Sequence, residues 1–230
     1  MLADPMAILA LVLSALGAGG VIRPSVALVG RAREERRRRK ETRETPQDFF
    51  YKTLVAGLRA VEPDQRYVYR RVARLVSRSD SLTRVPWGSR PFGDVEITRE
   101  VLDCSHPSIR LSLVDAGENV DRSDGWHRQY LQLSQPLRRG HEIEFVHSQS
   151  LVVTGKPLEH FLRWSPLTRC DQVTLQVAFA VDPPREVRYS AHACTGEELE
   201  WSLVPLDVIT GSFTKHVDDP IPGRYYKLTW

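Results

Sequence analysis

Apolar residues follow three different patterns along the chain, and the first of these predicts a membrane anchor. Residues 6–22 (MAILALVLSALGAGGVI) carry no charge, and residues 25–30 continue the apolar run after Arg23 and Pro24. As a helix, residues 6–22 would be about 25 Å long, which is nearly the thickness of the hydrocarbon core of a bilayer. A helix on the surface of a soluble protein would show a polar face, and this one shows none. We therefore expect residues 1–30 to form a membrane anchor helix.

The charges that flank this run predict how it is oriented. Only Asp4 is charged before the run, whereas basic residues follow it, and positive charge after a span favours the cytoplasmic side. A secretory signal peptide would carry its positive charge first. The prediction is an uncleaved anchor in the inner (plasma) membrane, with the N-terminus outside and the bulk of the chain cytoplasmic. A helix buried in a soluble assembly and a signal peptide are the alternatives. Small residues four apart (Ala10, Ser14, Ala18) favour self-association through the anchor.

Residues 31–45 are almost entirely charged and predict a solvated basic linker. They hold eight Arg or Lys residues and four Glu residues, and they offer no apolar face. Basic residues beside an anchor are attracted to anionic lipid headgroups by about 1 kcal/mol each. We expect contact with an anionic membrane surface through Arg36, Arg37, Arg38, Arg39 and Lys40.

The second pattern is a four-residue spacing of apolar residues, which predicts a helical hairpin over residues 46–80. Phe50, Leu54, Leu58 and Val61 follow at helical spacing, and Val68, Val72, Leu75 and Val76 form the apolar face of a second helix after the break at Glu62-Pro63-Asp64. Arginines at the same interval would form one ridge on the opposite face of the second helix. This ridge predicts a further contact with anionic lipid, or with nucleic acid phosphates as the alternative, through Arg66, Arg70, Arg74 and Arg78.

The third pattern, strict alternation of apolar and polar residues, predicts a mainly β domain over residues 81–230. Ile109, Leu111 and Leu113 alternate in this way, as does the segment from Val173 to Val181. Short runs of this kind, separated by Gly and Pro, are typical of an antiparallel β-sandwich or jelly roll. We expect a helical turn over residues 158–164 and nine strands, at residues 95–102, 109–115, 129–134, 142–147, 173–181, 186–192, 201–205, 211–216 and 225–230.

The C-terminal strand has a distinctive sequence, Pro222-Gly223-Arg224-Tyr225-Tyr226-Lys227-Leu228-Thr229-Trp230. It resembles the uncharacterised β-rich C-terminal domain, ending P-G-x-x-Y-x-L-x-W, of some regulatory and defence-associated proteins of GC-rich bacteria. The resemblance covers only the last third of the chain, and its shared residues are aromatic packing positions. It implies no activity and no functional residue. Tyr226, Leu228 and Trp230 alternate onto one face, so this strand should close the β domain.

The sequence offers no catalytic, metal or cofactor motif. Three cysteines are too few and too widely spaced for a metal site of the C-x-x-C type. The strongest candidates for a metal site are His141, Glu142, Glu144 and His147. Regular alternation, however, places the histidines on one face of the strand and the glutamates on the other. We expect neither cofactor nor metal.

Together these patterns predict a single-pass membrane-anchored protein with a cytoplasmic β-sandwich that binds or senses a protein partner without catalysis. A soluble regulator that binds nucleic acid through its arginines is one alternative. A jelly-roll enzyme with a metal site is the other.

Overall fold

A computed structural model describes residues 48–62, 65–89, 94–115, 127–155, 160–166 and 168–230. The predicted anchor at 1–30, the linker at 31–45 and the basic cluster Arg36–Lys40 lie outside the described residues. Among the residues that the structure describes, no helix has the length and apolar character needed to cross a membrane.

The described residues form a mainly β structure, which confirms the predicted class. The strands are β1 (Phe49–Glu62), β2 (Arg66–Ser77), β3 (Leu82–Ser89), β4 (Val95–Cys104), β5 (Leu111–Asp115), β6 (His127–Leu137), β7 (Glu142–Val153), β8 (Phe161–Trp164), β9 (Cys170–Phe179), β10 (Val187–Ala193), β11 (Glu198–Val204), β12 (Leu206–Asp207), β13 (Ser212–Asp218) and β14 (Arg224–Thr229). All nine strands predicted after residue 81 are present with somewhat different bounds. The helical turn predicted at 158–164 is wrong, because Phe161–Trp164 pairs with β14 as strand β8.

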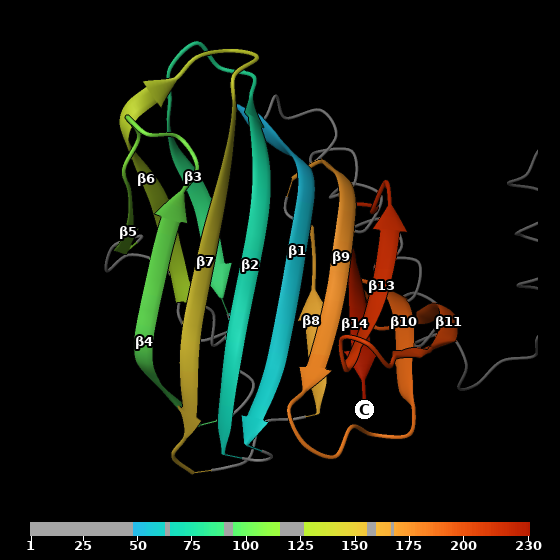
Figure 1. The fold of residues 1–230 in the computed structure, drawn as a ribbon. Coiled ribbons are helices and arrows are strands. Elements are labelled where there is room, and N and C mark those ends of the chain that lie inside the picture. Colours follow the sequence, from blue (N-terminus) through green and yellow to red (C-terminus); the bar gives the residue numbers. More distant parts are fainter. Residues whose placement is uncertain (1–47, 63–64, 90–93, 116–126, 156–159, 167) are drawn as a thin grey trace, which may run out of the picture. The chain divides into compact units, whose positions relative to one another are not determined.

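These strands build three sheets (Figure 1). The largest has seven strands in the order β12-β13-β9-β1-β2-β7-β4. A second sheet has the order β11-β10-β14-β8, and a third has the order β3-β6-β5. The expectation of purely antiparallel pairing is wrong at one place, where β1 and β9 run parallel. Parallel neighbours need a long connection, and more than 100 residues of chain separate these two strands.

The predicted helical hairpin at 46–80 is wrong, because residues 49–62 and 66–77 form β1 and β2. A spacing of four residues returns to one face of a strand as well as to one face of a helix, so the pattern fits both. The burial of the residues between the valines distinguishes a strand from a helix. Tyr67, Ala73 and Leu75 are buried, in alternation with the half-buried Val72 and Val76. The arginines therefore share a face with the valines and do not lie opposite them.

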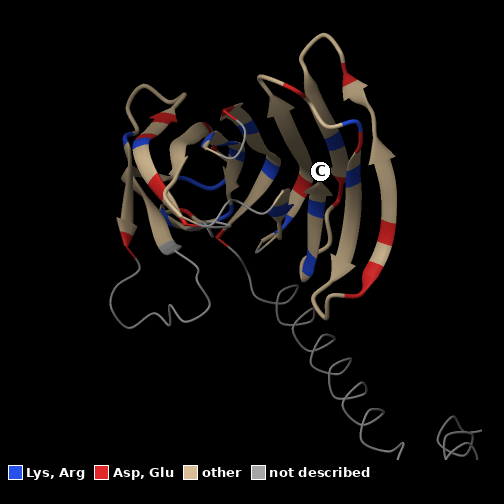
Figure 2. Ribbon diagram, turned by 90° about the horizontal axis from the view of Figure 1, so that it is seen from below, with Lys and Arg blue, Asp and Glu red and all other residues tan. Residues whose placement is uncertain are grey.

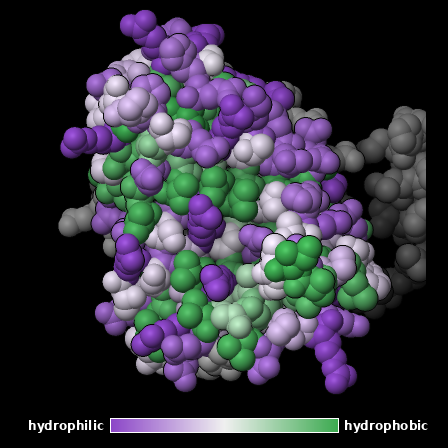
Figure 3. Space-filling view, in the orientation of Figure 1, coloured by the Kyte–Doolittle hydropathy of each residue, from purple (hydrophilic) through white to green (hydrophobic). Residues whose placement is uncertain are grey.

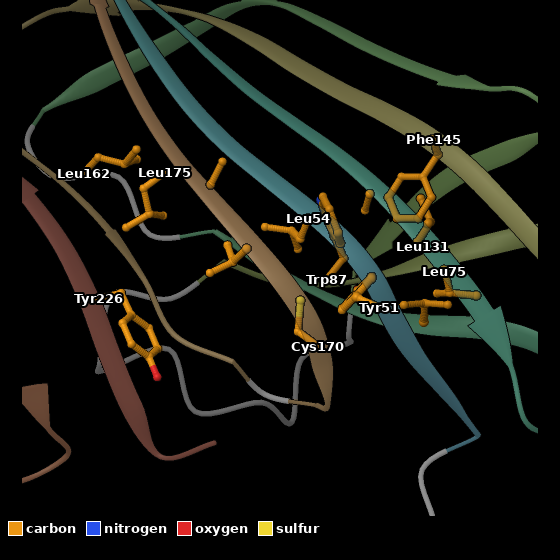
Figure 4. Close-up of a cluster of buried hydrophobic side chains, with 14 of the residues drawn as sticks. Tyr51, Leu54, Leu75, Trp87, Leu131, Phe145, Leu162, Cys170, Leu175 and Tyr226 are labelled. Atoms are coloured by element: carbon orange, nitrogen blue, oxygen red, sulfur yellow. The ribbon is translucent and has the colours of Figure 1, made fainter. Parts of the chain in front are cut away.

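The three sheets share one hydrophobic core. Leu54 and Leu75 contribute to it from β1 and β2, Leu131 from β6, and Leu162 and Tyr226 from β8 and β14 (Figure 4). The ring of Trp87 on β3 meets that of Phe145 on β7 edge to face, with centroids 5.3 Å apart. Residues 49–77 therefore belong to the same packed unit as the chain after residue 81.

Candidate functional site

One face of the seven-stranded sheet turns away from this core, and we call it the open face. In Figure 1 it faces the viewer, with β8 and β14 behind the sheet. Its side chains come from alternate positions of each strand, as the burial patterns of β1, β2 and β7 show. At its centre lie Val55, Gly57, Arg59, Val68, Arg70, Val72, Val146, Ser148 and Ser150.

Valines form an apolar row across the middle of the open face. Val55 on β1 pairs with Val72 on β2, and Val72 pairs with Val146 on β7. All three are half-buried. Figure 3 shows apolar surface across the middle of this face, interspersed with hydrophilic surface, and further apolar areas below it. Directly opposite residues in a sheet are close enough to make one continuous contact surface, so the row can receive aliphatic groups of a partner.

Gly57 leaves a gap in the next row of side chains. It lies between Arg70 on β2 and Gln176 on β9. A Cβ atom built on Gly57 would come no closer than 3.7 Å to any neighbouring heavy atom outside its own chain neighbours, which is ordinary van der Waals contact. Packing therefore does not require glycine here. Glycine inside a strand weakens it by about 0.5–1 kcal/mol relative to alanine and often marks a place where another molecule approaches closely.

The four arginines predicted to contact an anionic surface all belong to the open face or its end, but they differ in their contacts. Arg66 forms an ion pair with Glu62 at 3.3 Å, and Arg74 forms one with Glu142 at 2.7 Å. The guanidinium of Arg78 lies over the ring of Phe50, 4.8 Å from its centroid. Within the described residues, the Arg70 side chain has neither an ion pair nor a hydrogen bond. Arg70 and Arg78 therefore have no ionic partner within the described residues, and Arg70 is the one of the two that lies at the centre of the open face.

Two more arginines, which the sequence analysis did not single out, add to this central charge. Arg59 pairs in register with Val68, and Arg99 pairs with Ser150. Both side chains are exposed, and neither has an ionic partner among the residues that the structure describes. Carboxylates surround this centre on four strands, namely Glu62, Glu96, Asp103, Glu142, Glu144 and Asp218. Figure 2 shows basic and acidic residues interspersed along the strands.

One rim carboxylate is held in its charged form by its neighbours. A hydrogen bond from Lys52 and the nearby Arg74 guanidinium lower the pKa of Glu142 below its usual range. Glu142 therefore stays charged at neutral pH, and the arginines without an ionic partner form a basic centre inside the rim.

A second polar cluster lies on the inner face of the same sheet, around His147. This side chain is only 1% exposed. Its Nδ1 accepts a hydrogen bond of 3.2 Å from the indole N–H of Trp87. Its Nε2 lies 2.9 Å from Oε1 of Glu100, and Gln149 Nε2 donates to the same oxygen at 2.7 Å. The guanidinium of Arg71 lies over the Trp87 ring, 4.6 Å from its centroid.

These contacts fix the protonation state of His147. Because Nδ1 accepts from Trp87, the proton of the neutral ring must be on Nε2, where it is donated to Glu100. Burial lowers the pKa of His147, and the hydrogen bond to Glu100 opposes this only in part. Burial raises the pKa of Glu100, but the hydrogen bonds from His147 and Gln149 outweigh it and lower the pKa overall. The lone pair of the neutral ring, on Nδ1, accepts from Trp87, so at neutral pH it is not free to act as a base or a metal ligand.

The structure does not bring the four candidate metal ligands together. Glu142 and Glu144 lie on the open face, His147 lies on the inner face, and His141 precedes β7. This is the separation that the alternation predicted. Within the described residues, no group of three or more His, Cys, Asp or Glu side chains could hold a metal ion.

Sequence reasoning missed Glu100 and Trp87, the partners of His147. Glu100 is 47 residues from His147 in the chain, and only the pairing of β4 with β7 brings them together. One signal was present. Glu100 has the parity of Leu102 and Cys104 on its strand, so alternation could have placed an ionisable group on the side that faces the core.

Comparisons with known proteins do not assign a family. The chain matches no protein-family model and no curated protein sequence. Among solved structures, it is similar to an M1 zinc metallopeptidase from Deinococcus radiodurans, at 10% identity and a TM-score of 0.42. It is also similar to yeast LTA4 hydrolase, at 11% identity and a TM-score of 0.44. The matches cover 80% and 79% of this chain, but only 42% and 29% of those proteins. At these identities and TM-scores, neither likeness extends to the function of this chain.

Proposed function

We propose that this protein is a single-pass membrane protein whose β domain is a non-catalytic binding module for another protein. Residues 1–30 would cross the inner membrane with the N-terminus outside, and the domain would be a cytoplasmic β-sandwich. The observation that supports binding is the open face, where a row of valines lies beside arginines that have no ionic partner. The proposed partner offers aliphatic side chains to the valines and a carboxylate to Arg70.

The charge distribution favours a protein partner over a flat lipid surface at this face. An anionic membrane would meet the whole face at once, including the rim carboxylates that have no ion pair within the described residues (Glu96, Asp103, Glu144 and Asp218), and like charges would repel it. A protruding acidic side chain of a protein can reach Arg59, Arg70 and Arg99 at the centre without approaching the rim. The same rim disfavours nucleic acid, whose phosphates are spaced regularly along an extended backbone.

Contact with anionic lipid is therefore assigned to the basic cluster Arg36–Lys40, which directly follows the proposed anchor in the sequence. Each basic residue held near the surface contributes about 1 kcal/mol, and no defined geometry is needed. The ridge arginines Arg66 and Arg74 are neutralised by Glu62 and Glu142, so they add little to this attraction.

Membrane fractionation tests the anchor. The full-length protein should stay in the membrane pellet after washing with high salt and at alkaline pH, because a spanning helix is released only by detergent. A variant with Arg36–Lys40 replaced by glutamine should remain in the pellet too. Release of the wild-type protein by salt alone contradicts the anchor.

Site-specific photo-cross-linking in cells tests the partner. A photoreactive residue in place of Thr174, at the edge of the valine row, should give an adduct with a protein. The same residue in place of Glu197, in the turn before β11, is the control and should give none. Arg70→Glu should abolish the adduct, and Arg70→Lys should preserve it because the charge remains. An adduct with lipid, or one that survives Arg70→Glu, contradicts the proposal.

A further inference from the structure

Strand β11 lies at a free edge of the four-stranded sheet. Its one strand partner among the described residues is β10, and β10 in turn pairs with β14. A free edge presents a row of unpaired N–H and C=O groups and can accept another strand. Native proteins usually block such an edge with lysine, proline, a bulge or a covering element.

One irregularity interrupts the pairing of β11 with β10, between Glu198 and Glu200, and from Glu200 to Val204 the pairing is regular. The side chains of β11 do not block the edge. Leu199, Trp201 and Leu203 share one face of the strand and are 41%, 59% and 55% exposed. The two acidic residues are engaged within their own sheet. Glu198 forms an ion pair with Arg188, and Glu200 accepts a hydrogen bond of 2.9 Å from the hydroxyl of Tyr189. The edge is therefore apolar, and no charge on it is left free to repel an incoming strand.

The order of side chains along β11 is symmetric about Trp201. Apolar residues stand two positions before and two positions after it, at Leu199 and Leu203. We propose that β11 pairs with β11 of a second copy of this chain, in antiparallel register about a twofold axis at Trp201. Glu200 then lies opposite Ser202 of the other copy, and Leu199, at the irregularity of β11, lies near Leu203 of the other copy. No two like charges lie directly opposite each other, which a self-complementary twofold interface requires.

Pairing of this kind joins the two four-stranded sheets into one. The guanidinium of Arg188 lies over the Trp201 ring, 5.0 Å from its centroid, and holds the indole on the face that the two copies would share. Burial of this edge in lipid is disfavoured, since hydrocarbon offers nothing to the unpaired backbone groups. A second strand would both hydrogen-bond to the unpaired backbone groups of β11 and cover its apolar side chains.

The mass of the full-length protein in mild detergent, measured by sedimentation, tests the proposal. The wild type should have the mass of a dimer, and Trp201→Lys should have the mass of a monomer, because two lysines would meet at the twofold axis. Ile209→Lys adds the same charge at a residue that is 92% exposed in the β12–β13 turn, and it should remain a dimer. If Trp201→Lys fails to fold by circular dichroism, Leu203→Lys takes its place with the same expected result.

Three results overturn the proposal. They are a monomeric wild type, a dimer that persists in the folded edge variant, and a monomeric Ile209→Lys. A dimer that persists in the edge variant would mean that the protein self-associates through another part of the chain, such as the proposed anchor helix. A positive register test uses Trp201→Cys with Cys194→Ser, which removes the exposed native thiol. Directly opposite residues have Cα atoms close enough for a disulfide, so oxidation should link two copies through residue 201, and absence of that link contradicts the register.

Discussion

The indole N–H of Trp87 and Nδ1 of His147 are joined by a hydrogen bond of 3.2 Å between the three-stranded and the seven-stranded sheets. Trp87 is on β3, and His147 is on β7. Both side chains are buried, so the bond forms where water cannot replace it. It fixes the tautomer of His147, and through Nε2 it also sets the hydrogen bond to Glu100.

Trp87→Phe should therefore destabilise the domain. Phenylalanine retains much of the packing against Phe145 but leaves Nδ1 of His147 buried without a donor. An unsatisfied buried acceptor costs about 1–3 kcal/mol. Urea unfolding followed by circular dichroism measures the change in the free energy of unfolding. Ile209→Ala is the control, because Ile209 is almost fully exposed in the β12–β13 turn and lies outside the proposed interfaces, and it should change stability by less than about 0.5 kcal/mol. Equal effects of the two substitutions would mean that the hydrogen bond is unimportant.

Stability should fall as the solution is acidified from neutral pH. The folded pKa of His147 lies below the ordinary value of 6.5, so the unfolded state binds more protons below that pH. This contribution is complete above pH 6.5 and declines as the pH falls toward the folded pKa. The lowered pKa of Glu100 adds a second loss as the pH falls through its ordinary value of 4.5. Urea midpoints measured between neutral pH and pH 5 give the slope.

His147→Gln is the matched variant for this pH dependence. Glutamine cannot gain a proton in this range, so the loss of stability between pH 6.5 and pH 5 should become shallower. Glu100, Gln149, Trp87 and Arg71 surround the site from four strands, and the substitution leaves all of them in place. A slope that His147→Gln leaves unchanged would assign the pH dependence to other groups.

Sequence patterning predicted much of the fold because strict alternation has one structural meaning. Nine strands after residue 81 were predicted from it. Residues 49–77 were misassigned because Val68, Val72 and Val76 satisfy the period of a helix and of a strand equally. The alternate residues distinguish the two, since a helix gives no reason for Tyr67, Ala73 and Leu75 to be buried together.

The candidate site was predicted only in part, for a different reason. The arginine row on β2 is visible in the sequence, but the partners that neutralise it are not. Glu142, which pairs with Arg74, is 68 residues away in the chain and reaches it only because β2 and β7 are neighbours. Which arginine lacks an ionic partner depends on the order of the strands in the sheet, and local sequence patterns do not give that order.

Gly57→Ala and Gly57→Val should separate stability from binding. A side chain at position 57 would fill the gap on the open face without a close contact inside the protein. Removing glycine from a strand should raise the free energy of unfolding by about 0.5–1 kcal/mol. The photo-cross-link at Thr174 should weaken with alanine and disappear with valine, because the larger side chain blocks the approach of the partner. Loss of stability in both variants would instead give Gly57 a structural role.

Removal of Leu228–Trp230 should unfold the β domain. Strand β14 lies inside its sheet, with β10 on one side and β8 on the other. Leu228 is fully buried and pairs with Tyr189 on β10 and with Leu162 on β8. Loss of a buried leucine alone costs about 2–5 kcal/mol, and lost backbone hydrogen bonds add to this. The total is comparable to the stability of a typical domain, which is about 5–15 kcal/mol.

Stepwise shortening locates the residue that matters in this strand. Deleting Trp230 removes only the contacts of the last residue, including a ring contact with Phe179 and a backbone hydrogen bond to the carbonyl of His160. The domain should keep its cooperative urea transition at a lower midpoint, and Thr229 should add little. The transition should be lost when Leu228 is removed, because Leu228 is the one of these three residues that is fully buried in the core. A cooperative transition that survives removal of all three residues would show that the end of β14 is not needed for the domain to fold.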